Sequence, residues 1–142
     1  MYYLEAEASF DAAHFLKGYA GKCRNLHGHR WRVVVTIEGQ PLQKSGSQAG
    51  MLRDFGDLKA DLKALVDPLD HALLVEEGSL RPETVAALEA EDFRMVFLPF
   101  RTTAEHFAWY FYDRLQEAGY DVWETAVYET PTNCARYREE AR

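Results

Sequence analysis

The sequence predicts an α+β domain in which a four-stranded antiparallel sheet carries two helices on one face. Two observations lead to this prediction. Apolar and polar residues alternate in two stretches near the N-terminus and two near the C-terminus, as in half-buried strands. Between these pairs, apolar residues recur at helical spacing in two longer stretches. The order strand–strand–helix–helix–strand–strand favours a sheet covered by helices on one side, and 142 residues are enough for one domain, expected over 1–142.

The first two strands are expected over residues 2–10 and 27–38. In the first stretch every second residue is apolar or aromatic, so one face of the strand is apolar. In the second stretch one face begins with His27 and His29 and continues with apolar residues. A loop with glycines and basic residues, 15–26, connects the strands, and a polar loop over 39–50 follows the second one.

Two amphipathic helices are expected in the middle of the chain. The first follows Asp54, which can serve as its N-cap, and ends at Pro68. The second covers about 103–118 and stops at Gly119. The aromatic and leucine side chains of each helix fall on one side, which is expected to face the sheet.

The remaining segments are an acidic connection and a final pair of strands. Residues 75–93 are acidic and irregular, with a short helix near 82–91, and 94–100 is an apolar, strand-like run. Alternation resumes over 121–130, and a last strand at 134–139 would close a hairpin through the intervening turn.

Composition and charge exclude several classes of function. Sixteen Lys and Arg against 23 Asp and Glu give a net charge of −7, which argues against nucleic-acid binding. No apolar run approaches the roughly 18 residues of a membrane helix, and the N-terminus does not read as a signal peptide. Cys23 and Cys134 are therefore expected to be reduced thiols in a cytoplasmic protein.

Three histidines form the most informative pattern. In His27-Gly28-His29, two imidazoles two residues apart on a strand point to the same side. His14 follows the first strand, so a hairpin would bring it close to the other two. Three histidines with an open fourth position are typical of a catalytic zinc site. A chance pair of histidines on a strand is the alternative.

Cys23 lies four residues before His27 and has three interpretations. It can be a fourth zinc ligand, which would close the site. It can be a reactive thiolate, because Lys22, Arg24 and a metal would all lower its pKa. It can also be a small loop residue without a chemical role.

Four further residues, three of them acidic, can contribute to a site. Asp70 can orient the imidazole of His71, although adjacent residues need not touch. Glu129 ends a strand, where a carboxylate can accept two N–H groups from a guanidine-like ring edge. Glu105 has an ordinary explanation, because Thr102-Thr103-Ala104-Glu105 fits a helix capping box.

These residues resemble the 6-pyruvoyltetrahydropterin synthase and 6-carboxytetrahydropterin synthase family. The matching motifs occur in order along nearly the whole chain: Phe10-Asp11-Ala12-Ala13-His14, Cys23-Arg24-Asn25-Leu26-His27-Gly28-His29, Asp54-Phe55, Leu69-Asp70-His71, Thr103-Ala104-Glu105 and Glu129-Thr130. The resemblance implies the tunnelling fold (T-fold), with four antiparallel strands and two helices. It also implies a homohexamer of two trimers with sites at subunit interfaces.

The resemblance assigns roles to individual residues. It implies that His14, His27 and His29 bind Zn²⁺, that Cys23 is the catalytic thiol, and that Asp70 and His71 form an acid–base pair. Glu129 would anchor the pterin ring, and Glu105 and Thr130 would also bind substrate. The substrate would be 7,8-dihydroneopterin triphosphate.

Two functional alternatives stay open at this point. The product can be 6-carboxytetrahydropterin with acetaldehyde, on the way to queuosine and other 7-deazapurines. It can also be 6-pyruvoyltetrahydropterin, on the biopterin pathway. The compact chain resembles the carboxy-forming members more than the pyruvoyl-forming ones. The protein can instead be a non-catalytic, zinc-stabilised oligomeric binding module. Lys17, Lys22, Arg24 and Arg101 are candidates for binding the triphosphate.

Overall fold

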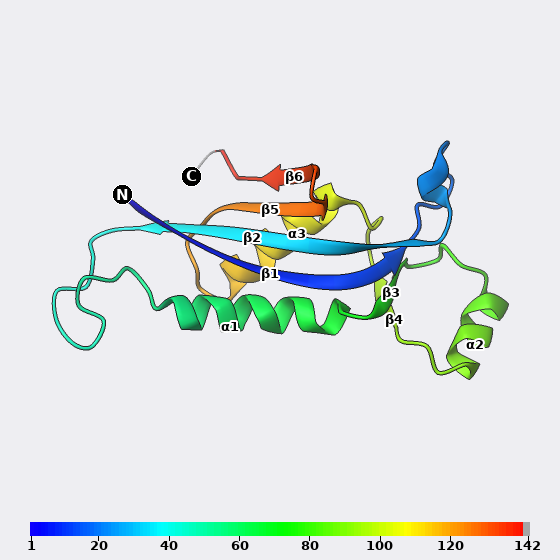
Figure 1. The fold of residues 1–142 in the computed structure, drawn as a ribbon, viewed down its shortest axis with the longest axis horizontal. Coiled ribbons are helices and arrows are strands. Elements are labelled where there is room, and N and C mark those ends of the chain that lie inside the picture. The colour runs from blue at the N-terminus through cyan, green and yellow to red at the C-terminus, as the bar shows by residue number, and fades with distance from the viewer. Residues whose placement is uncertain (141–142) are drawn as a thin grey trace.

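The computed structural model describes residues 1–140 and contains one six-stranded sheet with the strand order β4-β3-β1-β2-β5-β6. The strands are β1 (Tyr2–His14), β2 (His27–Gly39), β3 (Ala72–Glu76), β4 (Met95–Leu98), β5 (Val122–Thr130) and β6 (Asn133–Tyr137). The helices are α1 (Phe55–Val66), α2 (Pro82–Ala90) and α3 (Ala104–Glu117), with short 3₁₀ turns at Lys22–Arg24 and Asp67–Leu69. Figure 1 shows the long β1–β2 pair running through the middle of the sheet.

The prediction of a four-stranded antiparallel sheet is wrong in strand number and in direction. β1, β2, β5 and β6 are antiparallel as expected, but β3 pairs parallel with β1 and β4 pairs parallel with β3. β3 carries an apolar run rather than an alternating pattern, with Leu74 and Val75 fully buried. A short strand of this kind lacks the alternation by which half-buried strands are recognised. The strand-like run at 94–100 is confirmed as β4.

The β1–β2 hairpin is longer than predicted and positions two histidines. β1 continues four residues beyond the predicted end at residue 10, because its pairing with β2 extends to the His14–His27 pair. The third histidine, His29, lies opposite Ala12, one step further along the same face. The hairpin expected from the sequence thus brings the three histidines together.

α1 and α3 pack on the same face of the sheet, as predicted. Leu58 and Leu62 of α1 and Phe107 and Phe111 of α3 belong to one buried cluster with Trp31 of β2. The short helix expected near 82–91 is confirmed as α2, but it buries none of its residues and lies away from the other two helices (Figure 1).

The helix ends follow ordinary capping chemistry, with one correction. The Asp54 carboxylate accepts the Gly56 N–H at 2.7 Å, so the predicted N-cap of α1 is confirmed. Thr103, not Thr102, caps α3 and accepts the His106 N–H. The predicted capping box is therefore wrong, because Glu105 falls one position too early in the helix to close it. Gly119 ends α3 with φ +96°.

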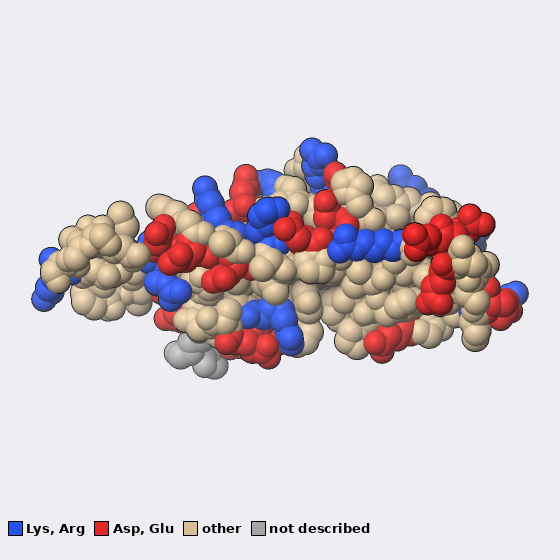
Figure 2. Space-filling view, turned by 90° about the horizontal axis from the view of Figure 1, so that it is seen from below, with Lys and Arg blue, Asp and Glu red and all other residues tan. Residues whose placement is uncertain are grey.

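The surface is mixed in charge. On the face shown in Figure 2, basic and acidic side chains are interspersed. In the described part of the chain, no helix is long and apolar enough to cross a membrane. Cys23 and Cys134 are both free thiols, as predicted.

Candidate metal centre and active site

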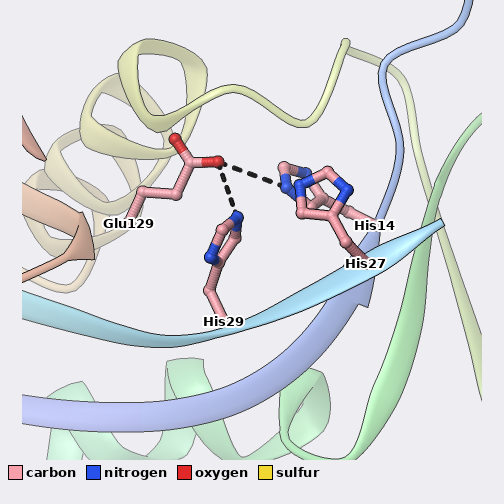
Figure 3. A group of neighbouring side chains, drawn as sticks. All are labelled: His14, His27, His29 and Glu129. Carbon is pink, nitrogen blue, oxygen red and sulfur yellow. Dashed lines mark ion pairs between the residues drawn. The ribbon is translucent and has the colours of Figure 1, made fainter. Parts of the chain in front are cut away.

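Three imidazoles converge at the end of the β1–β2 hairpin (Figure 3). The ring centroids of His14, His27 and His29 lie 4.6 to 5.2 Å apart. The fully buried ring of Trp31 supports this group from the core side, with its centroid 4.9 Å from that of His14. Packing against a rigid aromatic core restricts the rotamers of the histidines before any ligand binds.

Hydrogen bonds to backbone carbonyls orient two of the imidazoles. The Nδ1 atom of His14 lies 2.9 Å from the carbonyl oxygen of Thr102, and Nδ1 of His27 lies 2.6 Å from the carbonyl oxygen of Asn25. A carbonyl oxygen only accepts, so in both neutral rings Nδ1 donates and the lone pair resides on Nε2. Histidine ligands of metal ions commonly have this second hydrogen bond.

The three Nε2 atoms are buried and lack hydrogen-bond partners within the described residues. One ligand atom from each histidine and one from Glu129 all lie within 4.8 Å of one another. Donor atoms bound to one tetrahedral zinc ion lie roughly 3–4 Å apart, so small side-chain rotations suffice for a common ion. Buried acceptor atoms without partners are costly, and a bound cation would satisfy all of them. The residues present therefore fit a metal ion.

Glu129 lies at this metal group, which sequence analysis did not predict. One oxygen, Oε1, is 3.0 Å from Nε2 of His29 and 3.3 Å from Nε2 of His14 (Figure 3). The β2–β5 register explains the position: Arg32 pairs with Tyr128, so Glu129 follows on the histidine side of the sheet. Sequence alone does not reveal which residues of two distant strands are paired.

Burial and charge set the ionisation of the group. Burial lowers the pKa of His29 below its ordinary value and outweighs the opposing effect of Glu129. The pKa of Glu129 is also lowered, mainly because of the adjacent His14 side chain. A neutral imidazole and an ionised carboxylate are the forms that bind metal ions.

Asp70 and His71 form an ion pair that is attached to β1 by backbone hydrogen bonds. Oδ2 of Asp70 lies 3.0 Å from Nδ1 of His71, while its Oδ1 accepts the Asp11 N–H at 2.8 Å. The His71 N–H donates to the Asp11 carbonyl, and His71 adopts φ +56°. The Asp11 N–H is the main cause of the lowered pKa of Asp70. The contact between Asp70 and His71 that the sequence left open is therefore present.

Arg94, which sequence analysis did not single out, holds the segment that leads to this pair. Its guanidinium donates to the backbone carbonyls of Asp67, Pro68 and Asp70 at 2.6 to 3.2 Å. The residue directly precedes β4, so the parallel strands β3 and β4 bring it back to this segment. No local sequence signal indicates such a contact.

One cavity is bordered both by His71 of the acid–base pair and by His29 of the metal group. It has a volume of about 570 Å³ and is lined by His29 and His71, with Gly28 and Arg94 among its other residues. The His71 side chain is 77% exposed. The arrangement can place a proton donor or acceptor beside a molecule held near the histidines.

Cys23 lies in the 3₁₀ turn between the ligating strands and is partly buried. Its carbonyl accepts the Leu16 N–H at 2.9 Å, which closes the loop on itself. The group of neighbouring ligand atoms contains Glu129 and not Cys23. The structure thus favours a role for Cys23 other than that of a fourth metal ligand.

The remaining candidate substrate residues border Glu129. Glu105 and Glu129 line a common cavity of about 400 Å³. Thr130 lines a neighbouring cavity with Glu129, and its Oγ1 accepts the Thr132 N–H at 3.4 Å in the turn before β6. Of the basic candidates, Arg101 donates to the Lys17 carbonyl at 3.1 Å.

Comparison with known proteins identifies close relatives. A 6-carboxy-5,6,7,8-tetrahydropterin synthase of Haemophilus influenzae is 39% identical over 142 residues, covering 98% of this chain and 100% of the relative. A protein of the same name from Synechocystis is 37% identical over 139 residues, covering 96% and 93%.

Solved structures share the fold. An uncharacterized protein from Wolinella succinogenes matches with a TM-score of 0.78 at 22% identity, covering 98% of both chains. The 6-pyruvoyl tetrahydropterin synthase of Plasmodium falciparum matches with a TM-score of 0.70 at 21% identity, covering 97% of both chains. Residues 3–140 match the 6-pyruvoyl tetrahydropterin synthase family, and the chain belongs to this family.

Proposed function

We propose that the protein is a zinc-dependent 6-carboxy-5,6,7,8-tetrahydropterin synthase. It would convert 7,8-dihydroneopterin triphosphate and water to 6-carboxytetrahydropterin, acetaldehyde and triphosphate, a step towards queuosine and other 7-deazapurines. The names of the curated relatives support the choice of product. The observation that carries the chemistry is the convergence of three buried Nε2 atoms and the Glu129 carboxylate, in a chain that also holds an Asp–His ion pair.

His14, His27 and His29 would hold the metal through Nε2. A bound zinc ion supplies Lewis acidity towards the side-chain hydroxyls of the substrate. The carbonyls of Thr102 and Asn25 keep two of the three lone pairs directed into the site. The protein thus prepares the site before binding rather than rearranging around the ion.

Proton transfer would use Cys23 and His71 on different sides of the substrate. The pterin must lose and regain protons at separate positions, and a single acid–base group on one side of the ring cannot reach all of them. Oδ2 of Asp70 lies 3.0 Å from Nδ1 of His71, and this contact would leave Nε2 of the ring free for proton exchange. Cys23 lies between Lys22 and Arg24 in the 3₁₀ turn that joins the two histidine-bearing strands.

Substrate recognition would involve carboxylates and basic side chains at opposite ends of the pterin triphosphate. Glu129, with Glu105 in the same cavity, would pair with the guanidine-like edge, and Thr130 would lie beside it. Lys17, Lys22, Arg24 and Arg101 come from neighbouring segments and would serve the triphosphate.

The active form would be a cytoplasmic homohexamer of two trimers with sites at subunit interfaces. The high exposure of the His71 side chain supports this arrangement. Acid–base groups act more strongly in sites from which water is excluded, and a second subunit would cover the cavity between His29 and His71.

Product analysis tests the proposal. The zinc-loaded protein is incubated with 7,8-dihydroneopterin triphosphate without oxygen, and the products are measured by mass spectrometry and an acetaldehyde assay. A 6-carboxy product with acetaldehyde is expected. A 6-pyruvoyl product without acetaldehyde would assign the protein to the activity after which the family is named. No turnover with zinc bound, together with loss of folding on chelation, would favour a non-catalytic zinc-stabilised module.

A further inference from the structure

The contact between Glu129 and two histidines requires a proton or a metal ion between the carboxylate oxygen and the imidazole Nε2 atoms. Nδ1 of His14 donates to a carbonyl, so its Nε2 is an acceptor in the neutral ring. Glu129 Oε1 is also an acceptor and lies 3.3 Å away. Two acceptors at this distance repel each other unless a proton or a metal ion lies between them, and a metal ion would satisfy His14, His29 and Glu129 at once.

The distances resemble those between two ligands of the same ion. Glu129 uses one oxygen, Oε1, for both His14 and His29, at 3.3 and 3.0 Å. With bonds of about 2.0–2.2 Å, neighbouring ligands of a tetrahedral zinc ion are roughly 3.3–3.6 Å apart, which matches the His14 contact and is slightly longer than the His29 contact. Oε1 therefore lies where a fourth ligand completes the set formed by three histidines.

Glu129 is nevertheless held less firmly than the histidines. His14 and His27 each have a carbonyl that fixes the ring, whereas no backbone N–H of residues 1–140 is seen to anchor the Glu129 carboxylate. Its side chain is 25% exposed, and the residue borders cavities of about 400 and 420 Å³. A ligand without supporting hydrogen bonds, beside open space, can leave the metal without disturbing the fold.

We propose that Glu129 is an exchangeable fourth metal ligand: it binds the metal in the substrate-free enzyme and releases it when the pterin enters. The carboxylate would then pair with the guanidine-like edge of the pterin, the part of this inference that rests on the proposed function. No bond of the substrate is made or broken in this exchange. Glu129 thereby closes the metal site between turnovers and opens it only when substrate is present.

The test uses the protein loaded with Co²⁺, whose visible absorption depends on the number and type of its ligands. Glu129→Gln is compared with wild type and with Glu105→Gln, which removes a carboxylate from the same cavity but not from the metal group. Co²⁺ affinity is measured by competition with a chelator. We expect Glu129→Gln to change the spectrum and to weaken Co²⁺ binding at least about tenfold, while Glu105→Gln matches wild type.

The exchange itself is tested by adding 7,8-dihydroneopterin, which lacks the triphosphate. We expect the wild-type spectrum to change on addition. Equal affinity and spectra for wild type and Glu129→Gln would overturn the proposal that Glu129 is a ligand. A changed variant spectrum with no response of wild type to 7,8-dihydroneopterin would show a permanent ligand and overturn the exchange.

Both readouts are independent of turnover, so a failure of the proposed function is seen separately as absence of product. If Glu129→Gln does not fold, Glu129→Asp provides the same comparison, because its shorter side chain withdraws the carboxylate from the metal. An Asp variant with the wild-type affinity and spectrum would then count against the proposal.

Discussion

The Thr102→Val substitution would measure how much the surroundings of His14 contribute to metal binding. Thr102 is buried, and His14 Nδ1 lies 2.9 Å from its carbonyl oxygen and 3.1 Å from its hydroxyl oxygen. Valine has nearly the same shape, so the substitution removes the hydroxyl while keeping the carbonyl. It also leaves no new buried polar group without a partner.

The expected loss follows from the hydrogen bond that is removed. A hydrogen bond between neutral groups contributes about 0.5–1.5 kcal/mol, and about 1.4 kcal/mol corresponds to a tenfold change in affinity. Substitutions of residues that support metal ligands commonly cost about 10- to 100-fold in affinity. Because the Thr102 carbonyl remains, we expect the smaller effect, roughly three- to tenfold weaker zinc binding.

The assay is a competition titration with a zinc chelator. Thr36→Val is the matched control, since Thr36 is also a buried threonine and lies in β2, well beyond His29. The control should bind zinc like wild type. If Thr102→Val also binds zinc within twofold of wild type, the Thr102 hydroxyl does not support His14 and the reasoning is refuted.

Other substitutions test the acid–base groups and their support. Cys23→Ala and His71→Ala should each lower kcat by about 10²- to 10⁴-fold while retaining zinc; unchanged turnover of either variant would contradict the proposed mechanism. Asp70 has a folded-state pKa below its ordinary 3.8, so its carboxylate stabilises the fold above that pH. The free energy of unfolding of wild type should therefore exceed that of Asp70→Ala by its largest amount above pH 3.8, and this difference should shrink as the pH falls through the folded-state pKa. A difference that grows on acidification would contradict this reasoning. Arg94→Ala should speed amide hydrogen exchange at His71 and lower kcat, because it removes the hydrogen bonds to the carbonyls of residues 67–70. Arg81→Ala, at the N-cap of α2, should do neither.

Patterns within single strands and helices were sufficient to predict much of the fold. Period-two alternation identified β1, β2 and β5, and helical spacing identified α1 and α3. β3 was not predicted because its apolar run does not alternate with polar residues. Its parallel pairing with β1 and β4 joins segments that are far apart in the sequence, and no local pattern indicates that they pair.

The site residues likewise fall into those that could be predicted from local sequence and those that could not. His14, His27 and His29 could be predicted to meet because they belong to one hairpin. The position of Glu129 depends on the register between two strands separated by the whole middle of the chain. The contacts of Arg94 depend on a parallel crossover, so they too could not be read from local sequence.

The most direct test is the anomalous diffraction of crystals of the zinc-loaded protein, measured at the zinc absorption edge. The account predicts one strong peak in each chain, bonded to Nε2 of His14, His27 and His29. A peak bonded through Nδ1, a peak elsewhere in the chain, or fully loaded protein in which these three histidines hold no metal would contradict it.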